Sequence, residues 1–268
     1  MTKYQKLTWP SLLWYYAAVS WNGKSMNPKS IIKGATLITG GAKRIGKAIC
    51  LDLAESGYQI ALHYNHSKSE AKNLAELIQK KGVQCETFAC DLADERQTLQ
   101  LIERVHQQFP NLNLLINNAS VFQKSNLRTT EMAIFNQDIA INLKAPYILM
   151  RDFAKICRKG DIINILDTNI IKNKTAHLSY LLAKKTLGEL TKLSAVELAP
   201  QIRVNGIAPG LILPPVEKRD TYLTRLTQKI PLKKKGHPHQ ITQSIRFLLD
   251  NSYITGQIIY VDGGEHLI

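Results

Sequence analysis

The sequence predicts a doubly wound α/β fold, in which helices cover both faces of one seven-stranded parallel sheet. From about Gly34 onward, short apolar runs rich in Ile, Leu and Val alternate with longer stretches of helical period, as they do in βαβ units. The chain has 268 residues, 44% of them hydrophobic, which is enough to bury one large core. We therefore expect one large domain rather than two small ones.

The short apolar runs have the length and composition of buried strands. The seven predicted strands are Ala35–Thr39, Gln59–His63, Gln84–Ala89, Leu112–Ile116, Asp161–Leu166, Ile202–Ile207 and Gln257–Val261. The stretches between them keep a helical period, and several begin with Ser, Thr or Asp, which are favoured helix N-caps. The six predicted helices are Ile45–Ser56, Ser67–Lys80, Asp94–Phe109, Thr130–Ala154, His177–Leu198 and Gln240–Leu249.

Residues 1–30 differ in composition from the rest of the chain. They contain all three of its tryptophans, Trp9, Trp14 and Trp21. Two lysines precede an apolar run there, as in a signal peptide, but no small-residue cleavage site follows. We interpret the segment as a disordered or loosely docked leader, with translation starting at Met26 as an alternative. Residues 31–268 form the domain, and the segment 211–238, which has no clear periodicity, is expected to be a lid.

Charge and cysteine content exclude several functional classes. The net charge is +14, but the basic residues are scattered and form no repeat interleaved with aromatics, so we expect no nucleic-acid partner. The four cysteines form no CxxC pair, which indicates reduced thiols in a cytoplasmic protein and no metal site. No stretch reaches the ~20 apolar residues of a membrane span, so we expect no membrane partner.

A glycine-rich turn leads from the first predicted strand directly into a helix. Glycines there let the backbone approach a pyrophosphate, and the amide groups at the helix N-terminus favour its negative charge. An ordinary tight connection is the alternative, but the place of the turn in the first βαβ unit favours dinucleotide binding. The candidate residues are Thr39, Gly40, Lys43, Arg44, Ile45 and Gly46.

The end of the second predicted strand favours NADPH over NADH as the cofactor. NAD enzymes usually place an Asp or Glu there to hold the ribose 2′-hydroxyl. This chain instead has uncharged to basic residues that, together with Arg44, tolerate a 2′-phosphate, namely His63, Tyr64, Asn65, His66 and Ser67. At the end of the third strand Asp91, followed by Leu92, either accepts from the adenine amino group or caps the next helix.

Small polar residues follow the fourth predicted strand, where open α/β sheets bind their ligands. Asn118 and Ala119 therefore either line the cofactor site or brace the sheet. Further along, Tyr180 and Lys184 are four residues apart and share one face of a predicted helix. A neighbouring ammonium stabilises a phenolate, which lets Tyr180 donate a proton at neutral pH. Such a pair is common on helix surfaces, but its order after the other motifs makes it specific.

These motifs together resemble the short-chain dehydrogenase/reductase family from roughly Gly34 to the C-terminus, and Pro209-Gly210 and Val261-Asp262-Gly263-Gly264 fit that family as well. The resemblance implies a Rossmann-type fold, a homotetramer, a tyrosine that donates the proton, and a lysine that binds the nicotinamide ribose and lowers the tyrosine pKa. The family usually has a serine thirteen residues before the tyrosine, where this chain has Asp167. A carboxylate there would repel the negative charge that develops on a reacting carbonyl.

Aspartate at that position is what pteridine reductases have. The turn residue Arg44, the segment His63–Ser67 and the triplet Ser120-Val121-Phe122 are similar to the same subfamily, although His66 stands where an arginine is usual. The resemblance implies that Phe122 stacks on the pterin, while Ser120 and Arg44 contact ligand or cofactor phosphate. The candidate substrate-binding residues are Arg44, Ser120, Phe122, Asp167, Tyr180 and Leu211.

We therefore expect an NADPH-dependent reductase that transfers hydride to a ring C=N of a pterin, such as dihydromonapterin, or of dihydrofolate. Asp167, Tyr180 and Lys184 are the candidate catalytic residues, with the proton passing from Tyr180 or from Asp167. One alternative is a 3-oxoacyl thioester or other carbonyl reductase on the same scaffold. A second is a regulatory dinucleotide-binding protein without turnover, against which the intact pair of Tyr180 and Lys184 argues.

Overall fold

A computed structural model describes residues 32–213 and 226–268 of the chain. The predicted leader, 1–30, lies outside the described residues, as do residues 214–225 of the predicted lid. Within the described part of the chain, no helix is long and apolar enough to cross a membrane.

Seven parallel strands form one sheet in the order β3-β2-β1-β4-β5-β6-β7. The strands are β1 (Gly34–Ile38), β2 (Tyr58–Tyr64), β3 (Cys85–Ala89), β4 (Leu112–Asn117), β5 (Gly160–Ile165), β6 (Ile202–Pro209) and β7 (Ile258–Val261). All seven predicted strands and the doubly wound topology are confirmed. The order of the strands reverses between β1 and β4, and their carboxyl ends form the edge where this fold binds ligands.

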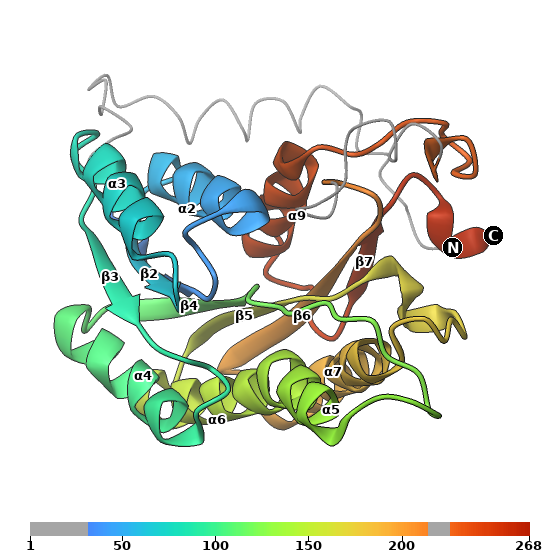
Figure 1. Cartoon of the computed structure of the whole chain (residues 1–268). Coiled ribbons are helices and arrows are strands. Elements are labelled where there is room, and N and C mark those ends of the chain that lie inside the picture. The colour runs from blue at the N-terminus through green and yellow to red at the C-terminus, as the bar shows by residue number, and fades with distance from the viewer. Residues whose placement is uncertain (1–31, 214–225) are drawn as a thin grey trace, which may run out of the picture. The chain divides into compact units, whose positions relative to one another are not determined.

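Helices cover the two faces of the sheet, as the view in Figure 1 makes plain. One face carries α2 (Arg44–Glu55), α3 (Lys68–Gln79) and α9 (Pro238–Asp250). The other carries α4 (Glu95–Gln108), α5 (Met132–Ile139), α6 (Ala145–Cys157) and α7 (Leu178–Glu197). Each face buries its own apolar cluster against the sheet, because the Ile, Leu and Val side chains of the strands alternate between the two sides.

The helix predicted over Thr130–Ala154 is interrupted in the structure. A π-helical turn, η2 (Ala140–Lys144), separates α5 from α6, and Pro146 occupies the first turn of α6. Proline has no N–H to donate to the carbonyl four residues earlier, which is that of Asn142, so the α-helical ladder is broken there. The prediction of one continuous helix is therefore wrong, and Pro146 is the residue that explains the break.

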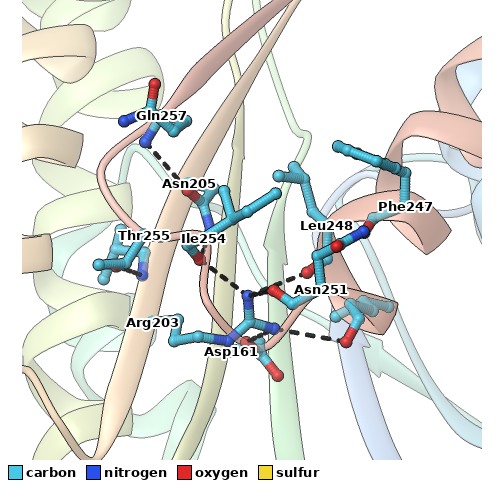
Figure 2. A network of polar contacts seen from close by, with 11 residues as sticks. Asp161, Arg203, Asn205, Phe247, Leu248, Asn251, Ile254, Thr255 and Gln257 are labelled. Carbon is cyan, nitrogen blue, oxygen red and sulfur yellow. Dashed lines mark hydrogen bonds and ion pairs between the residues drawn. The ribbon is translucent and has the colours of Figure 1, made fainter. Parts of the chain in front are cut away.

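Arg203, near the start of β6, joins the opposite edge of the sheet to the end of α9 (Figure 2). Its guanidinium donates to the carbonyl oxygens of Leu248 (2.9 Å), Asn251 (2.8 Å) and Ile254 (2.8 Å) and forms an ion pair with Asp161 at 2.6 Å. The last carbonyls of a helix have no partner within the helix, so this side chain supplies the donors that they lack. The contact stabilises the fold at a distance from the carboxyl edge.

Candidate functional site

The turn after β1 is fastened to the loop after β4 by side chains that the sequence placed at the cofactor site. The Thr39 hydroxyl accepts from the main-chain N–H groups of Asn118 (2.9 Å) and Ala119 (3.0 Å). The Asn118 side chain donates to the carbonyls of Thr39 (2.9 Å) and Gly40 (3.2 Å). These contacts brace the sheet at the point where the strand order reverses, which is one of the two roles considered for Asn118 and Ala119.

Two glycines shape the same turn. Gly40 has φ +63°, in the left-handed region that favours glycine. A Cβ on Gly46 would lie 2.1 Å from the Gly40 carbonyl oxygen, so only glycine lets the start of α2 pack this closely against the turn. The N-terminus of α2 therefore faces the carboxyl edge with an open main chain, which suits a diphosphate.

Basic residues flank this turn. Arg44 begins α2 with φ +54°, a conformation that is strained for any residue with a side chain. Lys43 forms an ion pair with Glu70 at 2.7 Å, and both side chains are about half exposed. Part of the positive charge that Lys43 was predicted to offer a ligand is thus already balanced by Glu70.

His63 lies beneath the turn rather than at the ligand surface. Its side chain is only 2% exposed, and both ring nitrogens bind main-chain groups. Burial lowers its pKa to about 4, so the ring is neutral at physiological pH. This geometry gives His63 no surface for the 2′-phosphate contact that was predicted for it.

The other residues of the predicted cofactor site divide by exposure. Asn65 and His66 are exposed beyond β2, while Tyr64 and Leu92 are largely buried. Asp91 accepts from the Ala93 N–H (3.0 Å) and the Asn65 side chain (3.2 Å) through one oxygen. The N-cap of α4 is Asp94, whose carboxylate accepts from two N–H groups of the first turn. The alternative role of Asp91 as the helix cap is therefore wrong.

Tyr180, Lys184 and Asp167 meet at the ends of α7 and β5. The Tyr180 hydroxyl donates to Oδ2 of Asp167 at 2.8 Å, and the buried Lys184 ammonium donates to the Ile165 carbonyl at 2.8 Å. The second Asp167 oxygen accepts from the main-chain and side-chain nitrogens of Asn169, each at 2.7 Å. One carboxylate thus both caps the short helix η3 (Thr168–Ile171) and holds the tyrosine.

The ionisation of Tyr180 differs from the expectation that Lys184 lowers its pKa. Burial raises the Tyr180 pKa well above its ordinary value, and the charge and hydrogen bond of Asp167 raise it further. Burial lowers the Lys184 pKa to about 8, against the attraction of Asp167. Without a ligand the pair therefore holds a protonated phenol beside a carboxylate, which is an arrangement for donating a proton rather than for accepting one.

An aromatic surface lies beside this pair. The Phe122 ring, 54% exposed, packs edge-on against Tyr180 at 4.7 Å between centroids and stacks on His177 at 3.8 Å. Ser120, two residues earlier, donates to the Asn142 side chain at 2.7 Å. Neither His177 nor Asn142 was among the predicted site residues. For Asn142 the sequence did hold a signal, Pro146, which marks the π turn in which Asn142 lies.

The C-terminal residues also reach the carboxyl edge. Asp262 accepts from the hydroxyl of Thr168, the neighbour of Asp167, and one of its carboxylate oxygens lies 2.9 Å from Nδ1 of His266. A Cβ on Gly210 would lie 2.5 Å from the Asp262 Cβ, which explains the glycine after β6. The Leu211 carbonyl accepts from Gly236 at 2.9 Å and ties the two described ends of the lid segment together.

Comparison with known proteins agrees with this geometry. The profile of a family described as enoyl-(acyl carrier protein) reductase matches residues 40–266. The 3-oxoacyl-[acyl-carrier-protein] reductase FabG of Staphylococcus epidermidis is 31% identical over 241 residues, which are 87% of this chain and 99% of the relative. The Thermotoga maritima protein of the same name is 30% identical over 242 residues, with 85% and 96% covered.

Solved structures with the same fold include proteins with other names. FolM alternative dihydrofolate reductase 1 from Brucella suis, in complex with NADP, superposes with a TM-score of 0.85 and 36% identity over 89% of this chain and 97% of that one. Acetoin dehydrogenase from Enterobacter cloacae gives a TM-score of 0.81 and 28% identity, with 89% and 97% covered. From the order of its motifs, its sheet and these matches, the chain belongs to the short-chain dehydrogenase/reductase family of oxidoreductases.

Proposed function

We propose that the protein is an NADPH-dependent reductase of a pterin, such as dihydromonapterin, or of dihydrofolate. The observation on which this depends most is the hydrogen bond from Tyr180 to the Asp167 carboxylate. Reduction of a C=N bond requires a proton at the nitrogen, and a paired phenol and carboxyl group can store and deliver one. Ketone reduction passes through an alkoxide-like oxygen, which a carboxylate at this place would repel.

NADPH fits the described residues around the turn. The close approach of Gly46 to Gly40 leaves the main chain at the start of α2 for the diphosphate, and Asp91, which follows β3, is the residue that would accept from the adenine amino group. The exposed residues that follow β2 are Asn65 and His66, neither of which carries a carboxylate that would repel a 2′-phosphate. Arg44 adds a cation. When bound, NADPH supplies the hydride.

The proton comes from this chain. Tyr180 gives its hydroxyl proton to the ring nitrogen, and a proton from solvent, passed along by the Asp167 carboxylate, restores the phenol. The Lys184 ammonium stabilises the negative charge that this buried pair carries. Phe122 offers its exposed face to a flat ring and holds it against the acid pair, and such positioning supplies much of the rate enhancement.

The test is NADPH oxidation, followed by absorbance, with dihydromonapterin or a related dihydropterin, with dihydrofolate and with a 3-oxoacyl thioester side by side. We expect turnover with one of the first two and little with the thioester. The variant Tyr180→Phe is the matched control, because it removes the donating hydroxyl and keeps the ring against Phe122. Turnover of the thioester alone would overturn the proposal.

A 3-oxoacyl reductase is the second candidate, and it is favoured by the names of the relatives that are 30–31% identical. In that case Asp167 would serve only as the cap of η3, and the exposed Phe122 would contact an acyl chain. The thioester arm of the same assay decides between the two substrates.

The quaternary and domain organisation are part of the same proposal. We propose a cytoplasmic homotetramer, because α7 presents the exposed apolar side chains of Leu182, Leu193 and Val196 for a second copy to cover. Residues 1–30 are a dispensable leader to a single catalytic domain, and residues 211–238 are its lid. Light scattering of the full chain, and activity of a chain that begins at Met26, test these two statements.

A further inference from the structure

A buried histidine joins the glycine turn to the two strands beside it. The Gly40 N–H donates to Nδ1 of His63 at 2.9 Å, and the Gly41 N–H donates to the His63 carbonyl at 2.9 Å. On its other side, Nε2 of His63 lies 2.9 Å from the carbonyl oxygen of Cys90, the residue before Asp91. One side chain thus connects the turn after β1, the end of β2 and the end of β3.

These contacts fix the tautomer of the ring. Because Nδ1 accepts from Gly40, it carries no hydrogen, and Nε2 must therefore carry the one that it donates to Cys90. Protonation of Nδ1 would point its N–H at the N–H of Gly40, so the hydrogen bond between them would be lost. Burial, which lowers the His63 pKa to about 4, keeps the ring in the single state that satisfies both neighbours.

We propose that His63 is a positioning residue for the dinucleotide, which holds the glycine turn in its phosphate-binding shape through Gly40. The inference rests on the proposed binding of NADPH. It differs from the 2′-phosphate role that the sequence suggested, because a buried neutral ring offers that phosphate neither charge nor contact. It also means that the Gly40 N–H is occupied by His63, so the diphosphate must use amides farther along the turn.

Loss of the His63 contact affects NADPH and NADH alike, whereas loss of a 2′-phosphate contact does not. NADPH and NADH share the same diphosphate and differ only at the 2′ position. Loss of the His63 contact must therefore weaken both cofactors by the same factor and leave their ratio unchanged. Loss of a 2′-phosphate contact would weaken NADPH alone.

Three variants separate the two hydrogen bonds of the ring. His63→Asn keeps an acceptor near the Nδ1 position and loses the donor to Cys90. His63→Gln places its amide near the Nε2 position, which keeps the donor and loses the acceptor for Gly40. His63→Leu loses both bonds and keeps most of the volume.

Dissociation constants of NADPH and NADH, measured by fluorescence titration of the full chain, are compared with thermal unfolding and with KM and kcat. We expect His63→Leu and His63→Gln to raise both dissociation constants and the KM for NADPH about tenfold, with kcat nearly unchanged, because the Gly40 N–H loses its acceptor and the turn is no longer held in shape. His63→Asn is expected to bind both cofactors nearly as the wild type does, although its melting temperature also falls.

Arg203→Met is the matched control for general destabilisation. It removes the contacts that hold α9 at the opposite edge of the sheet, so it should lower the melting temperature and leave both dissociation constants unchanged. Equal effects of Asn and Gln at position 63, or a changed ratio of NADPH to NADH affinity, would overturn the role of His63. Failure of the wild type to bind NADPH would instead overturn the proposed function.

Discussion

The Tyr180 hydroxyl donates a 2.8 Å hydrogen bond to the carboxylate of Asp167, thirteen residues earlier in the chain. Asp167 follows the end of β5 and Tyr180 lies in the first turn of α7, and the two meet because α7 begins at the edge of the sheet where β5 ends. The same carboxylate binds Asn169 with its other oxygen, so its position is fixed independently of the tyrosine. A substrate that replaces the carboxylate as the partner of Tyr180 would meet a phenol that is protonated and already aligned.

Substitution of Asp167 tests its role as an acid. Asp167→Asn keeps an oxygen for the cap of η3 and cannot relay a proton, so dihydropterin turnover should fall by roughly 10²–10⁴-fold while NADPH affinity stays nearly intact. Asp167→Ala should lose similar activity and also lose the cap. Turnover and thermal unfolding, measured on the same preparations, separate chemistry from stability.

Asp167→Ser is the sharper variant, because it installs the residue that the family usually has at this position. A serine hydroxyl is a far weaker acid than a carboxyl group, so the variant should remain poor with dihydropterin even where it folds well. Full dihydropterin turnover by a folded Asp167→Ser protein would refute the acid role. A gain of 3-oxoacyl thioester turnover in this variant would show that Asp167 selects the substrate class.

The Lys184 pKa predicts an alkaline limit to cofactor use. The ammonium is lost as pH rises through about 8. The parameter kcat/KM for NADPH reports ionisations of the free enzyme, so it should decline above that pH. The Tyr180 pKa, raised well above its ordinary value, lies too high to produce this limb. Lys184→Arg keeps its charge throughout and should lose the limb, at a lower overall rate. If the arginine variant showed the same alkaline decline in kcat/KM, the decline would have to come from another group.

The fold followed from the sequence because most strands are short runs rich in Ile, Leu and Val bounded by turn residues, with β3 (Cys85–Ala89) the exception. The predicted strand ends agree with the observed ones to within two residues. The exception was the region of Pro146, where apolar periodicity persists through a break in the hydrogen-bond ladder. Periodicity reports which face is buried, and it does not register the loss of a single N–H donor.

The site could be predicted only in part. Spacing along the chain was enough to bring Asp167, Tyr180 and Lys184 together, because Tyr180 and Lys184 share one face of a helix that begins where β5 ends. Order along the chain does not tell which residues at a strand end face the ligand. At the end of β2, His63 and Tyr64 are buried, whereas Asn65 and His66, which follow them, are exposed. The elevated Tyr180 pKa also required the structure, since it depends on burial and on a hydrogen bond.

The buried His63 should make folding stability depend on pH. An unfolded histidine binds a proton near pH 6.5, whereas the folded one does so only near 4, so stability is lost as pH falls through this window. The difference corresponds to about 3 kcal/mol. Denaturant unfolding of wild type and His63→Asn between pH 7.5 and pH 4.5 isolates this contribution, because the carboxylates are common to both. The advantage of the wild type should shrink in acid, and parallel curves would contradict the prediction.

Arg44 combines a strained backbone with a charge, and two substitutions separate them. With φ +54° the residue lies where a side chain costs roughly 1–2 kcal/mol, and glycine would relieve that strain at an entropic cost of roughly 0.5–1 kcal/mol. Both substitutions remove the contacts of the Arg44 side chain, so the strain is measured by the difference in stability between Arg44→Gly and Arg44→Ala, which should reach about 1 kcal/mol. Arg44→Ala keeps the strain and should be less stable than the glycine variant.

Both Arg44 variants lose the cation, so both should bind NADPH roughly 10–100-fold more weakly, as expected for a lost charge-assisted contact with phosphate. The affinity for NADH should change much less, because it lacks the 2′-phosphate. This pattern is the opposite of the one expected at His63, where both cofactors weaken together. Titration of the two variants with both cofactors, beside denaturant unfolding, checks affinity and strain separately. If Arg44→Gly kept full NADPH affinity and preference, a positive φ alone would be what the turn requires, and the Arg44 cation would have no part in cofactor choice.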